Sequence, residues 1–367
     1  MIAHDLPRPR RSRGAEPDVA LVLSGGNALG AYLAGAYEVL HDRGIRPSRI
    51  VGASAGALTA ALIAGNAPED RLPRLRQFWA EATQHTATSP TQMLKPRQVY
   101  NGLHAVLALL WGRPTIYRHR IPGLWSALPW VPNDLSLFDH APLRATLERL
   151  VDFRRLNEGE TRIVVGCIDV ESGEEVYFDN RRDTITADHL LASTAIMPAF
   201  PPVEIDGRLL CDAGYTINLP LDPIFAAEPE GDLTCIAVDL FALPAPRPAS
   251  LDAVLERAND LIFASASRRA ISALRREYGL RQELRPDGPA VTLLHIAYQA
   301  GPDELAAKSF DFSPSSIRDR WDAGLRDMAA GLSRLDHAPA DGGRFVYLPP
   351  EPHAAMALPG TEPAPVG

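Results

Sequence analysis

Short apolar runs alternate along this chain with longer stretches of helix-favouring residues. Val19 to Leu23 is fully apolar, Ile50-Val51 precedes a small-residue turn, and Leu233 to Leu240 is apolar at most positions. Such runs are typical of strands buried on both faces of a parallel sheet. Helices are expected from about Ala31 to Arg43 and from Leu251 to Tyr278. The pattern therefore predicts an α/β protein.

One serine stands where a predicted strand turns into a helix, within Gly52-Ala53-Ser54-Ala55-Gly56 and before the small-residue run Ala57 to Ala64. A turn this sharp strains the serine backbone, and a side chain two positions before or after it would collide with the neighbouring strand or helix. The following helix also points free amides and its positive dipole end at the hydroxyl. The pattern predicts a nucleophile elbow; the alternative is a turn that only packs tightly.

A glycine-rich loop follows the first predicted strand and reads Ser24-Gly25-Gly26-Asn27-Ala28-Leu29-Gly30. Its amides face one direction at a helix start, which favours an anion. A dinucleotide would need Gly-x-Gly-x-x-Gly and an acidic residue about 20 positions further on. This spacing does not match, and the next strand leads into Ser54. The loop is therefore interpreted as an oxyanion site formed by the amides of Gly25, Gly26 and Asn27.

Two further blocks complete a family pattern. They are Ala192-Ser193-Thr194-Ala195-Ile196-Met197-Pro198-Ala199-Phe200-Pro201-Pro202-Val203 and Asp212-Ala213-Gly214. With the loop and the serine elbow, they resemble the patatin-like phospholipase family. Phe310 to Ser313 and Arg318 to Gly324 are similar to the C-terminal extension of a bacterial branch, so the resemblance reaches about residue 330. It implies a three-layer α/β/α hydrolase with a mostly parallel central sheet.

The resemblance also implies a catalytic dyad. Ser54 would attack an acyl carbonyl, Asp212 would accept the serine proton, and the glycine-rich loop would hold the oxyanion. An exposed aspartate with a pKa of about 4 is a poor base for serine. Asp212 is therefore expected to be desolvated at the end of the strand Arg208 to Cys211. Its alternative role is to cap the turn before Tyr215.

Two residues depart from the family pattern. Asn27 replaces the third glycine of the loop, and Leu29 replaces a basic residue. Asparagine still supplies an amide and tolerates left-handed backbone angles. The missing cation weakens the inference of a phospholipid more than that of an ester. The implied substrate is a lipid acyl ester, at a membrane surface or in stored lipid or polyester. The alternatives are a short-chain esterase, a lipid-binding scaffold without turnover, and a nucleotide-binding module.

The histidines provide a check on the dyad, because a Ser-His-Asp enzyme needs a histidine beside the serine. Only His189 and His295 lie beside strongly patterned elements, where a helix start and strand packing explain them. The other His, Cys, Asp and Glu residues lack metal-ligand spacing, so neither a metal nor a cofactor is expected.

Residues 80–137 are expected to form an insertion of short helices and loops over the sheet edge, because prolines interrupt any longer helix. The insertion is rich in tryptophan. By hypothesis it lines an acyl-chain pocket or acts as a lid, with Trp111, Trp125 and Trp130 as the apolar contacts. The alternative is that these rings anchor the insertion to the core.

Composition sets the remaining limits. The 367 residues carry a net charge of -8, and this mildly acidic balance argues against a nucleic-acid partner. No apolar stretch approaches the roughly 20 residues that cross a bilayer, so any membrane contact would be peripheral and the protein is expected to be cytoplasmic. Three cysteines in apolar runs are predicted to be buried free thiols of a reducing compartment: Cys167, Cys211 and Cys235.

These features divide the chain into a disordered basic arm at 1–16, one hydrolase domain at 17–347 with a C-terminal extension from 250, and a disordered tail at 348–367. The oligomeric state stays open. The long helix of the extension carries a row of basic residues, interpreted as a solvated face rather than as a contact for anionic head groups. The row is Arg268, Arg269, Arg275, Arg276 and Arg281.

Overall fold

The computed structural model describes residues 18–84, 112–123, 125, 128, 130–245, 247–301, 304, 308–338 and 344–351. The predicted N-terminal arm, the middle of the 80–137 insertion with Trp111, and most of the predicted tail lie outside the described residues. Leu348 was expected to begin the tail. Instead it ends the last strand of the sheet, where it pairs with Leu294.

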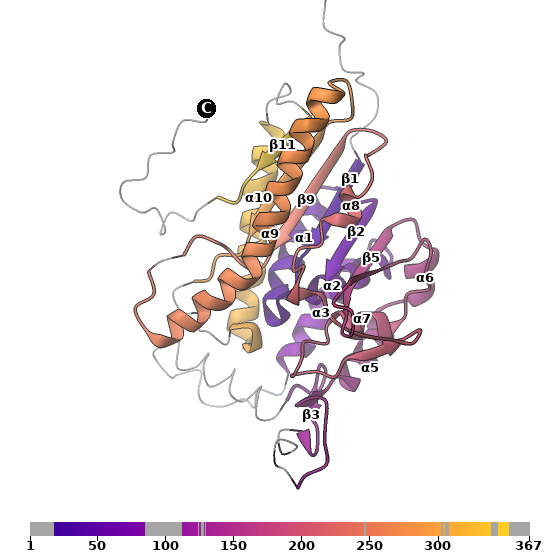
Figure 1. The fold of residues 1–367 in the computed structure, drawn as a ribbon, viewed down its shortest axis with the longest axis vertical. Coiled ribbons are helices and arrows are strands. Elements are labelled where there is room, and N and C mark those ends of the chain that lie inside the picture. Colours follow the sequence, from indigo (N-terminus) through magenta and orange to yellow (C-terminus); the bar gives the residue numbers. More distant parts are fainter. Residues whose placement is uncertain are drawn as a thin grey trace, which may run out of the picture.

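Nine strands of the described chain form one central sheet (Figure 1). In spatial order they are β11 (Phe345–Leu348), β10 (Val291–Ala297), β9 (Leu233–Asp239), β1 (Asp18–Leu23), β2 (Arg49–Ala53), β5 (Arg162–Asp169), β8 (Arg208–Asp212) and β7 (Val203–Ile205), and β6 (Glu175–Asp179) also pairs with β5. The pairs from β11 to β5 are parallel, whereas β6, β7 and β8 pair antiparallel. The mostly parallel sheet predicted from the sequence is thus confirmed. The short strands β3 (Arg118–His119) and β4 (Phe138–Asp139) form a separate antiparallel pair.

Apolar side chains on both faces of the sheet build two cores. Leu21 and Leu23 belong to one core and Ala20 and Val22 to the other, because successive side chains of a strand point to opposite faces. The first core includes residues of α1 (Ala31–Asp42), α2 (Ala55–Ala64), α3 (Arg71–Thr83), α5 (Ala141–Leu150), α6 (Phe153–Glu158), α7 (Ala187–Ser193) and α10 (Pro314–Asp336). The second includes residues of α8 (Asp222–Phe225) and α9 (Leu251–Leu284), which crosses the near face of the sheet in Figure 1. The chain therefore has the three layers that the resemblance implied.

The residues after 250 are part of this architecture. They supply β10 and β11 to the sheet and α10 to the layer that covers it. The long helix predicted to end at Tyr278 continues to Leu284. All three cysteines are free and buried, as predicted.

Helices α1 and α10 approach each other through two glycines. A Cβ added at Gly35 would lie 2.0 Å from the carbonyl oxygen of Trp321, and one added at Gly324 would lie 2.1 Å from that of Tyr32. The Tyr32 hydroxyl also donates to Asp327 at 2.9 Å. The close approach at the two glycines and this hydrogen bond together hold the C-terminal extension against α1.

The glycine contact predicts a stability effect. Gly35→Ala should lower the free energy of unfolding by at least about 2 kcal/mol, because a methyl group at 2.0 Å forces the helix backbones apart. Gly279→Ala is the matched control in α9, since a Cβ there meets nothing within 4 Å. It should raise stability by about 0.5–1 kcal/mol, because alanine favours helix. Urea unfolding measures both, and equal effects of the two changes would contradict the proposed close contact.

Candidate active site

Ser54 lies in the turn between β2 and α2, at the carboxyl end of a central strand. Its backbone has φ 52° and ψ −122°, a conformation that residues other than glycine adopt only where the surrounding structure enforces it. A Cβ added at Gly56 would lie 2.1 Å from the carbonyl oxygen of Leu23, and one added at Gly52 would lie 2.5 Å from the backbone of Gly56. Glycine is therefore required at both positions flanking the serine turn.

Ser193, at the end of α7, supports this turn. The amide of Ser54 donates to Ser193 Oγ at 2.9 Å, and that hydroxyl donates to the carbonyl oxygen of Gly166 in β5 at 2.7 Å. Ser193 is fully buried, so both bonds are shielded from water. The sequence pattern included Ser193 in a family block without assigning it a role. No local signal reveals this contact, because 139 positions separate the two serines.

Asp212 ends β8 and lies beside Ser54. Its carboxylate accepts the amide of Gly214 at 2.7 Å, and both Asp212 and Ser54 line the same cavity. Burial raises the pKa of Asp212 to about 6, against the opposing effects of the Ser54 side chain and the Gly214 amide. A carboxyl with this pKa is still ionised at neutral pH and is a stronger base than an exposed aspartate. The same carboxylate caps η4 (Ala213–Tyr215), so it also fills its alternative role.

The glycine-rich loop runs into η1 (Asn27–Gly30) and lies against the serine. The amide of Gly25 donates to the carbonyl oxygen of Asn218 at 3.1 Å, which corrects the expectation that Gly25 is an oxyanion donor. A Cβ at Gly25 would lie 2.9 Å from the Cβ of Ser54, so glycine instead permits the close approach of the loop. The amides of Gly26 and Asn27 make no hydrogen bond within the described residues, and Asn27 has a left-handed φ of 53°. These two amides remain the candidate donors.

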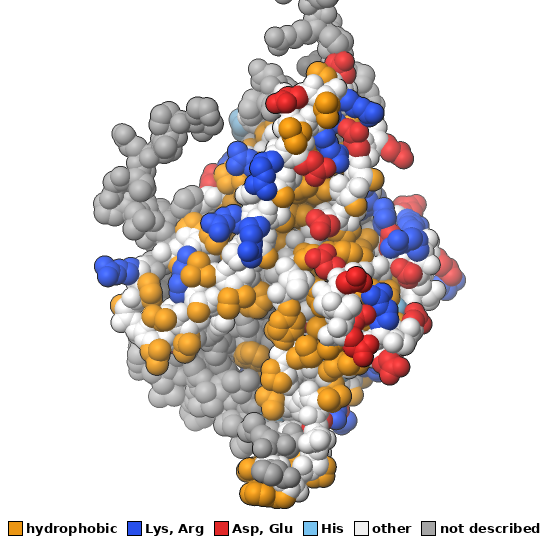
Figure 2. Space-filling model, viewed as in Figure 1, with side chains coloured by type: hydrophobic (Ala, Val, Ile, Leu, Met, Phe, Trp, Pro, Cys, Tyr) orange, Lys and Arg blue, Asp and Glu red, His pale blue; other side chains and the backbone are white. Residues whose placement is uncertain are grey.

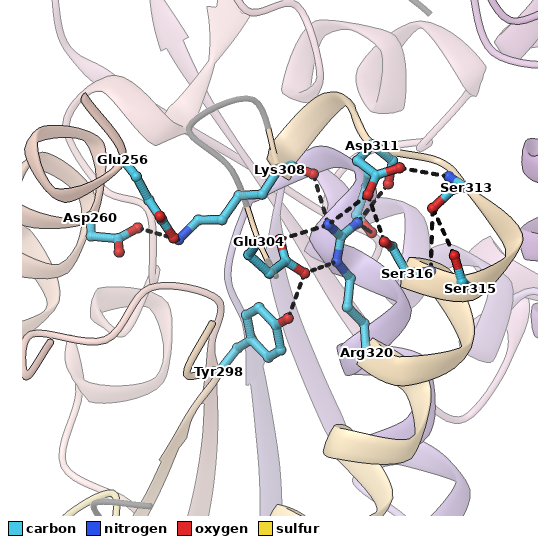
Figure 3. Close-up of polar contacts among 11 residues, drawn as sticks. Glu256, Asp260, Tyr298, Glu304, Lys308, Asp311, Ser313, Ser315, Ser316 and Arg320 are labelled. Carbon is cyan, nitrogen blue, oxygen red and sulfur yellow. Dashed lines mark hydrogen bonds and ion pairs between the residues drawn. The ribbon is translucent and has the colours of Figure 1, made fainter. Parts of the chain in front are cut away.

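The buried guanidinium of Arg320, in α10 (Figure 3), is hydrogen-bonded to the glycine-rich loop. Arg320 is fully buried and donates to the carbonyl oxygens of Ala28 at 3.2 Å, Asp311 at 2.7 Å and Lys308 at 3.0 Å. It also forms an ion pair with Glu304 at 2.9 Å, and the guanidinium lowers the pKa of that carboxyl against the effect of burial. Arg320 therefore ties the C-terminal extension to the glycine-rich loop. The sequence pattern gave Arg320 no role.

A cavity of about 260 Å³ opens onto Ser54 and Asp212. Its wall is mainly apolar and is formed by residues of the glycine-rich loop, of helices in the first core and of the C-terminal extension. The apolar lining residues are Leu58, Phe78, Trp79, Ile116, Leu143, Ile196, Phe200, Phe241, Phe263, Phe310 and Phe312.

The two described tryptophans that were expected at an acyl-chain pocket lie away from the cavity. Trp125 is 66% exposed and Trp130 is 78% exposed, and neither lines the cavity. Trp111 lies outside the described residues. The tryptophan that does line the cavity is Trp79, in α3.

The two histidines singled out in the sequence have structural contacts. His189 Nδ1 accepts the amide of Thr186 at 3.0 Å and caps α7, and His295 Nδ1 lies 3.1 Å from the Tyr347 hydroxyl, within β10. Both contacts match the roles expected from the sequence.

A third histidine, His140, lines the cavity that contains Ser54. Its ring stacks on Phe200 with an interplanar angle of 6°, and burial lowers its pKa to about 4. No hydrogen bond joins it to Ser54 within the described chain. Sequence reasoning missed His140, although it directly precedes Ala141-Pro142, a helix-start signal that places a side chain at a fixed position.

Within the described residues, no group of three or more His, Cys, Asp or Glu side chains could hold a metal ion. The same part of the chain contains no helix both long and apolar enough to cross a membrane.

Comparison with protein families decides the assignment. The model of the patatin-like phospholipases matches residues 21–225, which include the loop, the elbow and Asp212. The chain belongs to the patatin-like phospholipase family. A second model, described as patatin phospholipase, matches residues 267–340 and covers most of α9 with β10 and α10. The resemblance of the C-terminal extension to this family is thereby confirmed.

Curated bacterial proteins are similar in sequence to this chain. NTE family proteins of Mycobacterium tuberculosis and Mycobacterium bovis are 29% identical over 73% of this chain, which spans 62% of their length. The YqhO protein of Bacillus subtilis is 58% identical over 12% of this chain and 15% of its own length.

Solved structures are more distant. VipD from Legionella pneumophila aligns with 87% of this chain and 67% of its own, at 15% identity and a TM-score of 0.42. Human GIVD cytosolic phospholipase A2 aligns with 87% of this chain and 60% of its own, at 14% identity and a TM-score of 0.41. Family membership therefore rests on the sequence match.

The buried carboxyl of Asp212 predicts a pH-dependent stability difference. Because folding raises its pKa from 3.8 to about 6, the ionised form destabilises the folded state, and stability is lost as the pH rises through 6. Asp212→Asn should therefore be more stable than wild type by about 3 kcal/mol at pH 8 and by little below pH 4.

Urea unfolding at pH 4, 6 and 8 measures this difference. Asp70→Asn, at an exposed residue, serves as the control and should show no comparable gain with pH. A stability difference for Asp212→Asn that stays constant between pH 4 and pH 8 would refute the burial effect.

Proposed function

We propose that this chain is a serine hydrolase that cleaves lipid acyl esters through a dyad of Ser54 and Asp212. The observation that carries the proposal is a serine with φ 52° that shares a mainly apolar cavity with a buried carboxyl whose pKa is raised to about 6. Membership of the patatin-like phospholipases supports the same reaction class.

In the proposed reaction, Ser54 Oγ attacks the acyl carbonyl carbon while Asp212 accepts the hydroxyl proton. The negative charge that develops on the carbonyl oxygen is held by the amides of Gly26 and Asn27, at a barrier reduction of about 3 kcal/mol per donor. The protonated Asp212 then gives its proton to the leaving alcohol. Water, activated by the same carboxylate, attacks the acyl-enzyme, and Ser54 recovers its proton as the free acid departs.

The lining of the cavity favours binding of an apolar acyl group over binding of an anionic head group. Leu29, at the position where the family pattern has a basic residue, is fully buried in the first core. Among the described residues, Lys308 is the lysine or arginine that lines the cavity, and it is already paired with Glu256 at 3.0 Å and Asp260 at 2.8 Å (Figure 3). A long apolar chain is therefore the ligand that matches the wall.

The dyad predicts which substitutions stop turnover. Ser54→Ala and Asp212→Asn should each lower kcat for p-nitrophenyl esters by at least about a thousandfold, whereas His140→Phe should keep the rate within about threefold. In wild type, kcat/KM should rise with pH through about 6, because Asp212 must be ionised to accept the proton. Fluorophosphonate labelling should require Ser54.

The controls separate the alternative functions. Circular dichroism and urea unfolding establish that each variant is folded. Loss of activity in His140→Phe with activity retained in Asp212→Asn would replace the dyad with a Ser-His mechanism. A wild type that binds lipid but neither labels nor turns over any ester would be a scaffold. Nucleotide binding retained by Ser54→Ala, without labelling, would indicate the nucleotide-binding module.

We further propose that the exposed tip of the insertion touches the lipid surface. The tip is the part of the described insertion around 121–135, where five large apolar side chains are exposed. Figure 2 shows hydrophobic side chains at the lower end of the molecule. Tryptophan at such a position is suited to the membrane interface, since one part of the ring is apolar and its N–H is polar. The five are Ile121 at 94%, Trp125 at 66%, Leu128 at 37%, Trp130 at 78% and Leu135 at 70% exposure.

The tip predicts a defect confined to lipid surfaces. The double variant Trp125→Ala/Trp130→Ala should lower binding to phospholipid vesicles by about tenfold, because two interfacial rings are removed. Turnover of a soluble short-chain ester should not change. Leu280→Ala/Leu284→Ala, at residues 61% and 82% exposed on α9, is the matched control and should bind vesicles like wild type.

Vesicle sedimentation and ester assays measure the two effects. Equal vesicle binding by the tip variant and wild type would refute membrane contact at the tip. If the tip variant instead lost activity only on monomeric long-chain esters, these tryptophans would contact the acyl chain, as expected from the sequence.

A further inference from the structure

A second cavity, of about 320 Å³, lies at the carboxyl ends of β9 and β10 beneath α9. Phe241 lines both this cavity and the one that contains Ser54. Open α/β sheets bind ligands at the carboxyl ends of their strands. The second cavity has the same relation to the sheet as the candidate active site, but none of the groups in the proposed hydrolysis lines it.

Two arginines stand at the α9 side of this cavity. Arg268 and Arg275 are seven positions apart, which places them two turns apart on one face of the helix, and both line the cavity. Neither forms an ion pair with a carboxylate of the described chain. Arg275 lies over the ring of Tyr347 at 5.7 Å. Figure 2 shows basic side chains along α9 on this face of the molecule.

The inner part of the cavity carries two buried polar atoms without a hydrogen-bond partner in the described structure. They are Asp239 Oδ2 and His295 Nε2, which lie 3.7 Å apart on side chains that are 1% and 10% exposed. The other polar atom of each group is engaged, since Asp239 Oδ1 accepts the amide of Phe241 and His295 Nδ1 contacts the Tyr347 hydroxyl. Buried polar groups are normally satisfied, and at 3.7 Å the two atoms are too far apart for a hydrogen bond with each other, so a ligand group that bonds both would satisfy them.

We propose that this cavity binds a polyol phosphate, with the phosphate on Arg268 and Arg275 and a hydroxyl group between Asp239 and His295. A hydroxyl can donate to the carboxylate and bond the imidazole at once. Paired arginines bind phosphate oxygens through several N–H groups. A plain anion fits less well, because at the inner end it would meet the Asp239 carboxylate. The apolar walls, which include Phe241 and Ile271, accommodate the carbon backbone.

Calorimetry with sn-glycerol 3-phosphate tests this site on the full chain. One equivalent should bind wild type, and Arg268→Ala/Arg275→Ala should weaken binding by at least about tenfold. Arg269→Ala/Arg276→Ala is the matched control, because these residues have the same spacing on α9 but do not line the cavity. It should bind within about twofold of wild type.

The inner contacts are tested by ligand preference. Wild type should bind sn-glycerol 3-phosphate at least about tenfold more tightly than inorganic phosphate, and His295→Gln should reduce this preference without abolishing phosphate binding. Absence of binding, equal losses in the two arginine variants, or equal affinity for the two ligands in wild type would each overturn the proposal.

Vesicles that contain phosphatidylglycerol distinguish the sources of the ligand. Displacement of bound glycerol phosphate by the vesicles would identify a lipid head group, whereas failure to displace it would identify a free polyol phosphate. Either result is consistent with recognition of a polyol phosphate in this cavity. Because binding is measured without turnover, its outcome is independent of the proposed ester hydrolysis.

Discussion

The close approach of the serine turn to the end of β1 is the constraint on which the site depends. Gly56 brings α2 so near that a Cβ would lie 2.1 Å from the carbonyl oxygen of Leu23. Strand β1 continues directly into the glycine-rich loop, so the same approach sets Gly25 against Ser54. The strained backbone of Ser54 costs about 1–3 kcal/mol. Burial of every residue of α2 in the core holds the turn in place against that strain.

Burial has opposite effects on stability and on chemistry at Asp212. Removing the carboxylate from water destabilises the folded protein at neutral pH, yet it raises the pKa of the group to about 6 and makes it a stronger base. The hydrogen bond from the Gly214 amide fixes the carboxylate at the end of β8. The side chain itself is buried, which limits its hydration. A site that uses a carboxylate as its base needs this loss of stability, because hydration would return the pKa to its ordinary value.

The C-terminal extension supports the site rather than forming an appendage. A buried guanidinium destabilises a protein unless its N–H groups are paired. Arg320 meets this requirement through three backbone carbonyls and Glu304, and one of the carbonyls belongs to Ala28 in the glycine-rich loop. The glycine contact between α1 and α10 brings α10 close enough for Arg320 to reach Ala28. The family match over residues 267–340 accordingly covers a segment that supports the loop.

The fold and the core of the site could be predicted because their signals are local. Apolar runs predicted the strands, and small residues around Ser54 predicted the elbow, since backbone strain depends on immediate neighbours. Contacts between distant segments were not predicted. The fold alone joins Ser193 to Ser54 across 139 positions and Arg320 to Ala28 across 292, and it engages the Gly25 amide that the sequence left available. Exposed tryptophans were likewise ambiguous, because a large ring suits a pocket and a surface equally. Sequence thus indicated the candidate catalytic groups, and tertiary structure decided their partners, because partners across elements depend on sheet register and helix packing.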